Sequence, residues 1–226
     1  MQLFLFVLAP GLLQTQAAGR AERAPSSNFS DKLGLWEGVP QRVKERSKWS
    51  MDSGVGVIIK TFSPKSLYSD NYETYEGPGE GLTYNLTLSY QLHAFDWRTE
   101  RLRLQPTLEV PLMFTLVDQN TGGIVPDINL GLLLRWRDFP WNRHIYTTCG
   151  LGGGLSYSYE PWQADLDKHP GEDRSKTKFW LTYQWTFALP SHPQHQLLFF
   201  LDHQSGGWFF DDGGVEAAGI GYRHLF

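Results

Sequence analysis

The chain has 226 residues, a formal net charge of −4, 41% hydrophobic residues and 15% aromatic residues. Its length suits a single domain, and the near-neutral charge disfavours nucleic acid as a partner. Cys149 is the single cysteine. The chain therefore cannot form an internal disulfide, and we expect this thiol to behave as a small apolar group.

The first residues have the character of an export signal. An apolar run from Leu3 to Ala9 is followed by small residues near Ala17–Gly19. The run is too short to cross a bilayer as a helix, and it lacks the basic residues that usually precede such a run. A buried N-terminal segment is the alternative. We expect residues 1–19 to form a secretory signal peptide.

Residues 20–50 follow no strand pattern. They are polar and partly basic, and a run of this kind is usually solvated. We assign them to an N-terminal extension with no predicted role, and residues 51–226 to a β-barrel domain. No other stretch is long and apolar enough for a transmembrane helix. An exported chain of this kind is either soluble in the periplasm or an outer-membrane barrel.

From Leu82 to Leu92, apolar and polar residues alternate strictly. A period of two is the signature of a strand with one apolar face. Further segments repeat the pattern, so that about eight strands are expected. These segments are 53–62 (weaker), 102–116, 124–136, 145–159, 178–189, 197–205 and 214–226.

The lengths of the strands and of their connections favour a membrane protein. The strands have roughly 10 to 15 residues, against about 5–6 in ordinary sheets. Long connections alternate with short ones, as in outer-membrane barrels, where long loops are extracellular and short turns periplasmic. The long ones are 63–79, 160–175 and 206–213, and the short ones are 93–100, 137–143 and 190–194. The predicted fold is therefore all-β: an eight-stranded antiparallel transmembrane β-barrel of the outer membrane.

The polar face of these strands carries charged residues, namely Arg101, Arg103, Glu109, Asp127 and Arg135. Charges inside a closed barrel can pair, whereas charges facing lipid are costly. We therefore expect the apolar face to point outward. A soluble eight-stranded barrel with an apolar interior is the alternative. The terminal Phe226, with Tyr222 on the same face, is typical of an outer-membrane assembly signal, although His224 between them departs from it.

The last two strands carry a candidate catalytic site. Continuing the alternation places His203 and Ser205 on the outward face, beside the long connection 206–213, and Glu216 on the same face of the next strand. A serine hydroxyl becomes a nucleophile when an imidazole takes its proton, and a carboxylate can orient that imidazole. Polar groups are also tolerated where lipid meets water, so three ordinary rim residues are the alternative.

His203–Gly207, followed after an interval by Gly213–Glu216, resembles the C-terminal motif of the outer-membrane lipid A 3-O-deacylases. The resemblance covers most of the barrel and is specific in this last hairpin. It implies an eight-stranded barrel that removes an ester-linked acyl chain from lipid A without a cofactor. It also implies that Ser205 is the nucleophile, His203 the base and Glu216 the orienting acid.

One position departs from the family pattern. The family usually has Asn directly after the serine, where this chain has Gly206. The resemblance implies that this Asn helps form the oxyanion hole, so its absence leaves the backbone N–H groups of Gly206 and Gly207 as donors. Losing one donor lowers a rate about 100- to 1000-fold. On this basis we expect the substitution Gly206→Asn to raise activity.

The expected partners are lipopolysaccharide and the other lipids of a Gram-negative outer membrane, with a second copy of the chain as a further candidate. We expect no cofactor and no metal, because no metal-ligand cluster stands out. The glycines at 150 and 152–154 are not a phosphate loop, since no Lys-Ser/Thr follows them. The alternative to a deacylase is a non-catalytic structural or adhesive barrel.

Overall fold

The computed structural model describes residues 48–60, 74–98, 103–121 and 123–226. The expected signal peptide and nearly all of the expected N-terminal extension lie outside these residues, so both stay predictions. The first strand begins at Trp49.

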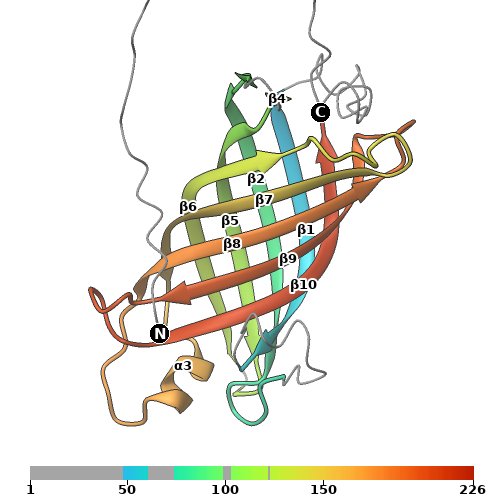
Figure 1. The fold of residues 1–226 in the computed structure, drawn as a ribbon. Coiled ribbons are helices and arrows are strands. Elements are labelled where there is room, and N and C mark those ends of the chain that lie inside the picture. The colour runs from blue at the N-terminus through green and yellow to red at the C-terminus, as the bar shows by residue number, and fades with distance from the viewer. Residues whose placement is uncertain (1–47, 61–73, 99–102, 122) are drawn as a thin grey trace, which may run out of the picture.

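The described chain forms a closed antiparallel barrel of eight strands (Figure 1). In chain order these strands are β1 (Trp49–Ile59), β2 (Gly81–Ala94), β5 (Thr107–Gln119), β6 (Ile124–Trp136), β7 (Tyr146–Ser158), β8 (Thr177–Ala188), β9 (His195–Ser205) and β10 (Gly214–Leu225). Each pairs with its neighbour along the chain, and β1 closes the barrel against β10. The expected eight-stranded barrel is confirmed. Two short strands, β3 (Trp97–Arg98) and β4 (Arg103–Leu104), form a separate sheet, and one short helix, α3 (Gln163–Lys168), lies between β7 and β8.

The wall is apolar outside and polar inside, as the alternation predicts. In β8, for example, Leu181, Tyr183 and Trp185 are exposed, while Thr182 and Gln184 between them are buried. An apolar belt with a polar interior suits a barrel surrounded by lipid and not one surrounded by water. The chain is an outer-membrane β-barrel. Among the described residues, no helix is long and apolar enough to cross a membrane.

One expected strand begins later than its pattern indicates. The barrel strand β5 starts at Thr107, and Arg103 belongs to β4, outside the barrel wall. Pro106, between them, has no N–H to give to a strand ladder. Its carbonyl accepts a hydrogen bond from the Phe95 backbone at 2.9 Å, within the connection that follows β2. Arg101 lies outside the described residues.

Buried charges fill the interior. Glu109 is 2% exposed and contacts Arg135 at 3.1 Å and Arg223 at 2.8 Å, and Arg223 also contacts Asp52 at 2.9 Å. Arg135 donates a further hydrogen bond to Gln184 at 2.6 Å. Buried charges are tolerated when they are paired and hydrogen-bonded in this way. The inward positions expected for Glu109, Asp127 and Arg135 are confirmed.

The connections at the two ends differ. One end carries the described residues of four connections, 60 and 74–80, 120–121 and 123, 159–176 and 206–213, with α3 at the bottom of Figure 1. The other carries the described residues 95–98, 103–106, 137–145 and 189–194, together with the start of β1 and the end of β10. Long loops of outer-membrane barrels are extracellular. The end with α3 is therefore the extracellular end, and the β9–β10 connection belongs to it.

Candidate active site

The end of β9 is held to the wall by side chains that point inward. Asp202 accepts a hydrogen bond from the Trp180 indole at 3.3 Å, and Gln204 donates one to Asp127 at 2.8 Å. All of these side chains are buried. Because strand residues alternate between faces, anchoring Asp202 and Gln204 inside directs the residues between and after them to the lipid-facing side.

His203 and Glu216 meet on that outer face. They are directly opposite each other in the β9–β10 register, and His203 Nδ1 lies 3.1 Å from Glu216 Oε1. Their side chains are 28% and 13% exposed. With Glu216 ionised, the hydrogen of this contact must be on Nδ1, because a carboxylate only accepts. Nε2 is then the basic nitrogen, which is the tautomer that a general base requires.

Ser205 stands beside this pair, directly opposite Gly214. A Cβ atom added at Gly214 would lie 3.3 Å from Ser205 Cβ and 3.6 Å from His203 Cε1, so this glycine leaves the space between the two side chains open. Among the described residues, Ser205 and His203 form no hydrogen bond with each other. The structure therefore brings His203 and Glu216 together and places Ser205 next to them without a hydrogen bond to His203.

Gly206 belongs to a tight turn. Its N–H donates to Gly213 O at 3.0 Å, and its carbonyl accepts from Phe209 N at 3.0 Å and Phe210 N at 2.9 Å. A Cβ atom on Gly206 would lie 2.2 Å from Asp211 O and 2.4 Å from Asp211 N. The backbone of Asp211 thus leaves no room for any side chain at this position. An asparagine at position 206 would require the turn to shift, which argues against the expected gain from Gly206→Asn; that gain stays a prediction.

Gly207 is the second expected oxyanion donor. Its φ is +60°, a left-handed conformation that glycine adopts without strain. Within the described part of the chain, its N–H donates to no other backbone group. Of the two N–H groups, that of Gly206 is engaged in the turn and that of Gly207 is the one left open.

Asp211 holds the β9–β10 loop in place, a role that nothing in the local sequence signals. It accepts hydrogen bonds from Lys178 Nζ at 2.7 Å, from the Ser175 backbone at 2.8 Å and from the Gly213 backbone at 3.0 Å. Burial alone would raise the pKa of Asp211, but these bonds outweigh it and hold the pKa below its ordinary value. The carboxylate thereby joins the β7–β8 and β9–β10 connections.

Lys168, the last residue of α3, lies next to the candidate site. Its ammonium donates to Gly214 O at 3.0 Å and to Lys60 O at 3.2 Å, and it lies 5.9 Å from the centre of the Tyr75 ring. Burial lowers the pKa of Lys168, and the charge of Glu216 partly opposes this effect. No local pattern in the sequence marks Lys168, because its partners are distant in the chain.

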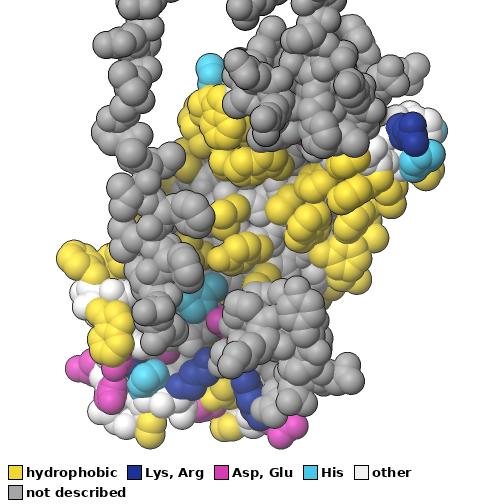
Figure 2. Space-filling model, viewed as in Figure 1, with side chains coloured by type: hydrophobic (Ala, Val, Ile, Leu, Met, Phe, Trp, Pro, Cys, Tyr) yellow, Lys and Arg dark blue, Asp and Glu magenta, His cyan; other side chains and the backbone are white. Residues whose placement is uncertain are grey.

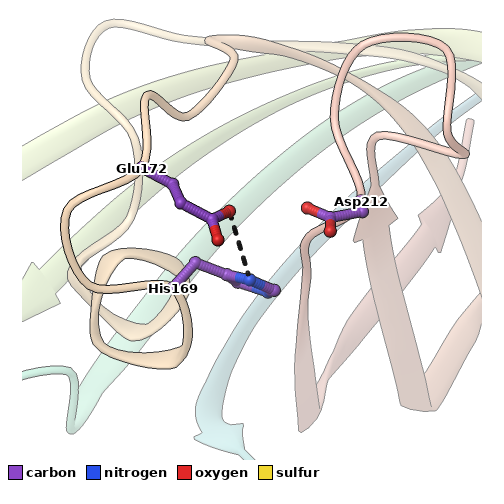
Figure 3. Close-up of side chains that lie close together, drawn as sticks. All are labelled: His169, Glu172 and Asp212. Atoms are coloured by element: carbon purple, nitrogen blue, oxygen red, sulfur yellow. Dashed lines mark ion pairs between the residues drawn. The ribbon is translucent and has the colours of Figure 1, made fainter.

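Three side chains have the composition of a metal site. The ligand atoms of His169, Glu172 and Asp212 all lie within 4.8 Å of one another, with the first two following α3 and the third in the facing loop (Figure 3). However, Arg174 Nη1 already contacts Glu172 Oε2 at 3.2 Å and Asp212 Oδ1 at 2.8 Å. This guanidinium provides the positive charge that the two carboxylates require, so their approach is explained without a metal.

Neither a protein-family model nor a curated protein matches the chain. The fold does occur in solved structures. The outer membrane enzyme PagL is 14% identical with a TM-score of 0.53, covering 78% of this chain and 99% of PagL. Neisserial surface protein A is 11% identical with a TM-score of 0.46, covering 79% and 96%. Ail, the attachment invasion locus protein of Yersinia pestis, is 14% identical with a TM-score of 0.37, covering 80% and 99%. The likeness to PagL shows a shared barrel fold, and at this identity it assigns no activity.

Proposed function

We propose that this protein is a serine esterase of the outer membrane that hydrolyses an ester-linked acyl chain of a lipid A-type lipid in the outer leaflet. The observation that carries the proposal is the 3.1 Å contact between His203 and Glu216 beside Ser205, on the lipid-facing wall at the extracellular rim. A site there meets a lipid substrate sideways, without drawing it out of the membrane.

The chemistry follows from these three groups. Ser205 Oγ attacks the ester carbonyl carbon while His203 Nε2 takes the hydroxyl proton. The tetrahedral intermediate collapses to an acyl-serine, and the leaving alkoxide takes the proton from His203. Water then attacks the acyl-serine by the same proton route, releasing the fatty acid and restoring the hydroxyl. Glu216 keeps Nδ1 protonated and stabilises the imidazolium that forms in each half of the reaction.

Two further features support the proposal. The backbone N–H of Gly207 is a candidate donor to the developing oxyanion, since a preorganised donor of this kind stabilises the negative charge. The resemblance of His203–Gly207 and Gly213–Glu216 to the lipid A 3-O-deacylases supplies the substrate class. Lipid A resides in the outer leaflet, at the height of this rim.

A non-catalytic barrel is the second candidate. Two observations favour it: Ser205 and His203 form no hydrogen bond among the described residues, and the Gly206 N–H is already engaged with Gly213. Catalytic hydrogen bonds are often long in the absence of substrate and tighten in the complex, so the first observation is compatible with either function. Polar rim residues with a structural ion pair would also produce this geometry.

The experiment that separates the two functions is a mass-spectrometric assay. Purified protein is incubated with lipid A in mixed micelles, and loss of one acyl chain is followed in the wild type and in Ser205→Ala. Ser191→Ala is the matched control, because Ser191 Oγ lies 2.9 Å from His192 Nδ1 at the opposite end of the barrel. We expect loss of the acyl chain with the wild type and the control, and none with Ser205→Ala. An intact lipid with folded wild-type protein would favour the non-catalytic barrel.

A further inference from the structure

The β9–β10 loop carries two large apolar side chains that are almost fully exposed. Trp208 is 80% exposed and Phe209 is 78% exposed, more than any other large hydrophobic side chain in the described part of the chain. The two follow Ser205 by three and four positions. Exposing this much apolar surface to water is unfavourable, and exposed apolar patches usually mark a binding surface.

The backbone that carries these side chains is strained and anchored. Trp208 has a φ of +63° and is the sole described non-glycine residue with a positive φ, a conformation that costs energy. Its N–H donates to Asp211 O at 3.0 Å. Asp211 is in turn fixed by Lys178 and by the backbone of Ser175. A strained residue on a firmly anchored loop indicates that the indole is held outward.

The exposed pair is continuous with the lipid-facing wall. Phe179 lies opposite Ser205 on β8, and its ring centre is 5.1 Å from that of Phe210 and 6.4 Å from that of Phe209. The ring centres of Phe209 and Phe210 are 5.0 Å apart. An aromatic cluster therefore runs from the barrel wall to the tip of the loop.

The direction of the loop agrees with this continuity. In Figure 1 the β9–β10 connection projects to the side of the barrel at the lower left, whereas α3 lies below the barrel. Figure 2 shows hydrophobic side chains at the same lower-left projection. A loop that leaves the wall sideways at the end of the apolar belt enters the region where acyl chains meet headgroups. Trp and other aromatic side chains favour that region.

We propose that Trp208 and Phe209 form a wedge that inserts between outer-leaflet lipids, and that the partner of this surface is the acyl chains of those lipids. The second part of the inference rests on the proposed function: the wedge parts neighbouring lipids beside Ser205, so that an ester at the acyl–headgroup boundary reaches the hydroxyl. The wedge is a positioning element and takes no part in the bond changes.

The first arm of the test measures depth and needs no activity. The full-length protein carrying Cys149→Ala and Ser205→Ala receives a single new cysteine by Trp208→Cys, is labelled with an environment-sensitive fluorophore and is reconstituted into vesicles with brominated acyl chains. Asp173→Cys is the matched control, because Asp173 is exposed in the β7–β8 connection of the same end. We expect quenching at position 208 to exceed that at position 173 by about two-fold or more. Equal quenching at the two positions would overturn the wedge, and concentration-dependent protection of the label without quenching would assign the surface to a second copy of the chain.

The second arm measures substrate access. We expect the double variant Trp208→Ala/Phe209→Ala to raise KM for a vesicle-embedded substrate by about ten-fold, because each large aromatic side chain contributes strongly to lipid contact. Hydrolysis of a short-chain soluble ester should be unchanged. Tyr159→Ala is the control, since Tyr159 is 65% exposed at the same end. Equal loss on both substrates would overturn the positioning role. If the wild type hydrolyses neither substrate, the proposed function fails while the depth measurement still decides the wedge.

Discussion

Glu109 and Glu216 occupy the two faces of the same barrel wall and have opposite surroundings. Glu109 is inside, where Arg135, Arg137 and Arg223 all lie within 3.3 Å of its oxygens. Glu216 is outside and directly contacts His203. The three guanidinium groups around Glu109 stay charged at any ordinary pH and balance its negative charge. His203 beside Glu216 can instead take up and release a proton. The inner contact is suited to holding strands together, and the outer one to chemistry.

Substitutions in the outer pair should have the largest effect on the rate of deacylation and little effect on stability. We expect His203→Ala to lower the rate of deacylation by about 10⁶-fold and Glu216→Ala by about 10⁴-fold, since orientation contributes only part of the rate. Neither substitution should alter the urea midpoint of unfolding by much, because both side chains are on the outer face. Rates are measured by mass spectrometry of the lipid and stability by unfolding in detergent. If both variants kept wild-type rates, the outer pair would be structural like the inner one.

Removing the inner carboxylate should lower stability and leave the rate of deacylation unchanged. Glu109→Gln leaves buried guanidinium groups with less compensating charge, and breaking a buried pair costs about 3–5 kcal/mol. We therefore expect a lower free energy of unfolding and an unchanged rate per folded molecule. Urea titration in detergent measures the first and the lipid assay the second. A variant with full stability and reduced activity would show that the interior network acts on the site.

The turn at Gly206 gives a test that distinguishes this loop from the family pattern. Because the backbone of Asp211 occupies the space of a Cβ atom, we expect Gly206→Asn to disorder the loop and to lower activity. Gly123→Asn is the control, since a Cβ atom on Gly123 would meet nothing within 4 Å and its φ is not positive. Limited proteolysis of the loop and the lipid assay are the measurements. Increased activity in Gly206→Asn would show that the turn can open to admit the side chain.

The smallest expected effect concerns the pH dependence of the loop. The pKa of Asp211 is lower in the folded protein than its ordinary value, so its contribution to stability is present above that ordinary value. It is lost as the pH falls through the depressed folded value. We expect acid to increase hydrogen exchange in residues 206–213 of the wild type, and Asp211→Asn to remove this dependence. The same acid response in both proteins would assign it to another group.

The wall of the barrel could be predicted because strand alternation is a local property. The outward and inward residues of β8, such as Leu181 and Thr182, follow directly from a period of two. The start of β5 could not be predicted in this way. Leu102 and Leu104 continue the alternation, but the two-stranded sheet and Pro106 interrupt the barrel strand.

At the site, the pairing of His203 with Glu216 could be anticipated from their shared face and from the pairing of strands that are adjacent in the chain. The crowding at Gly206 could not, because it depends on how Asp211 folds back across the turn. The position of Lys168 beside the site could not be predicted either, since its contacts with Lys60 and Gly214 join positions 108 and 46 residues away in the chain. Contacts of this kind are fixed by barrel closure and leave no local pattern.

The most direct test of the central claim is covalent labelling of the nucleophile. The folded protein is treated in mixed micelles with a long-chain alkyl fluorophosphonate, which reacts with activated serine hydroxyls, and the adduct is located by peptide mass spectrometry. We expect one adduct per chain on Ser205, lost in His203→Ala and unchanged in Ser191→Ala. An unmodified Ser205 in a protein that hydrolyses lipid A, or a single adduct on a different residue, would contradict the account.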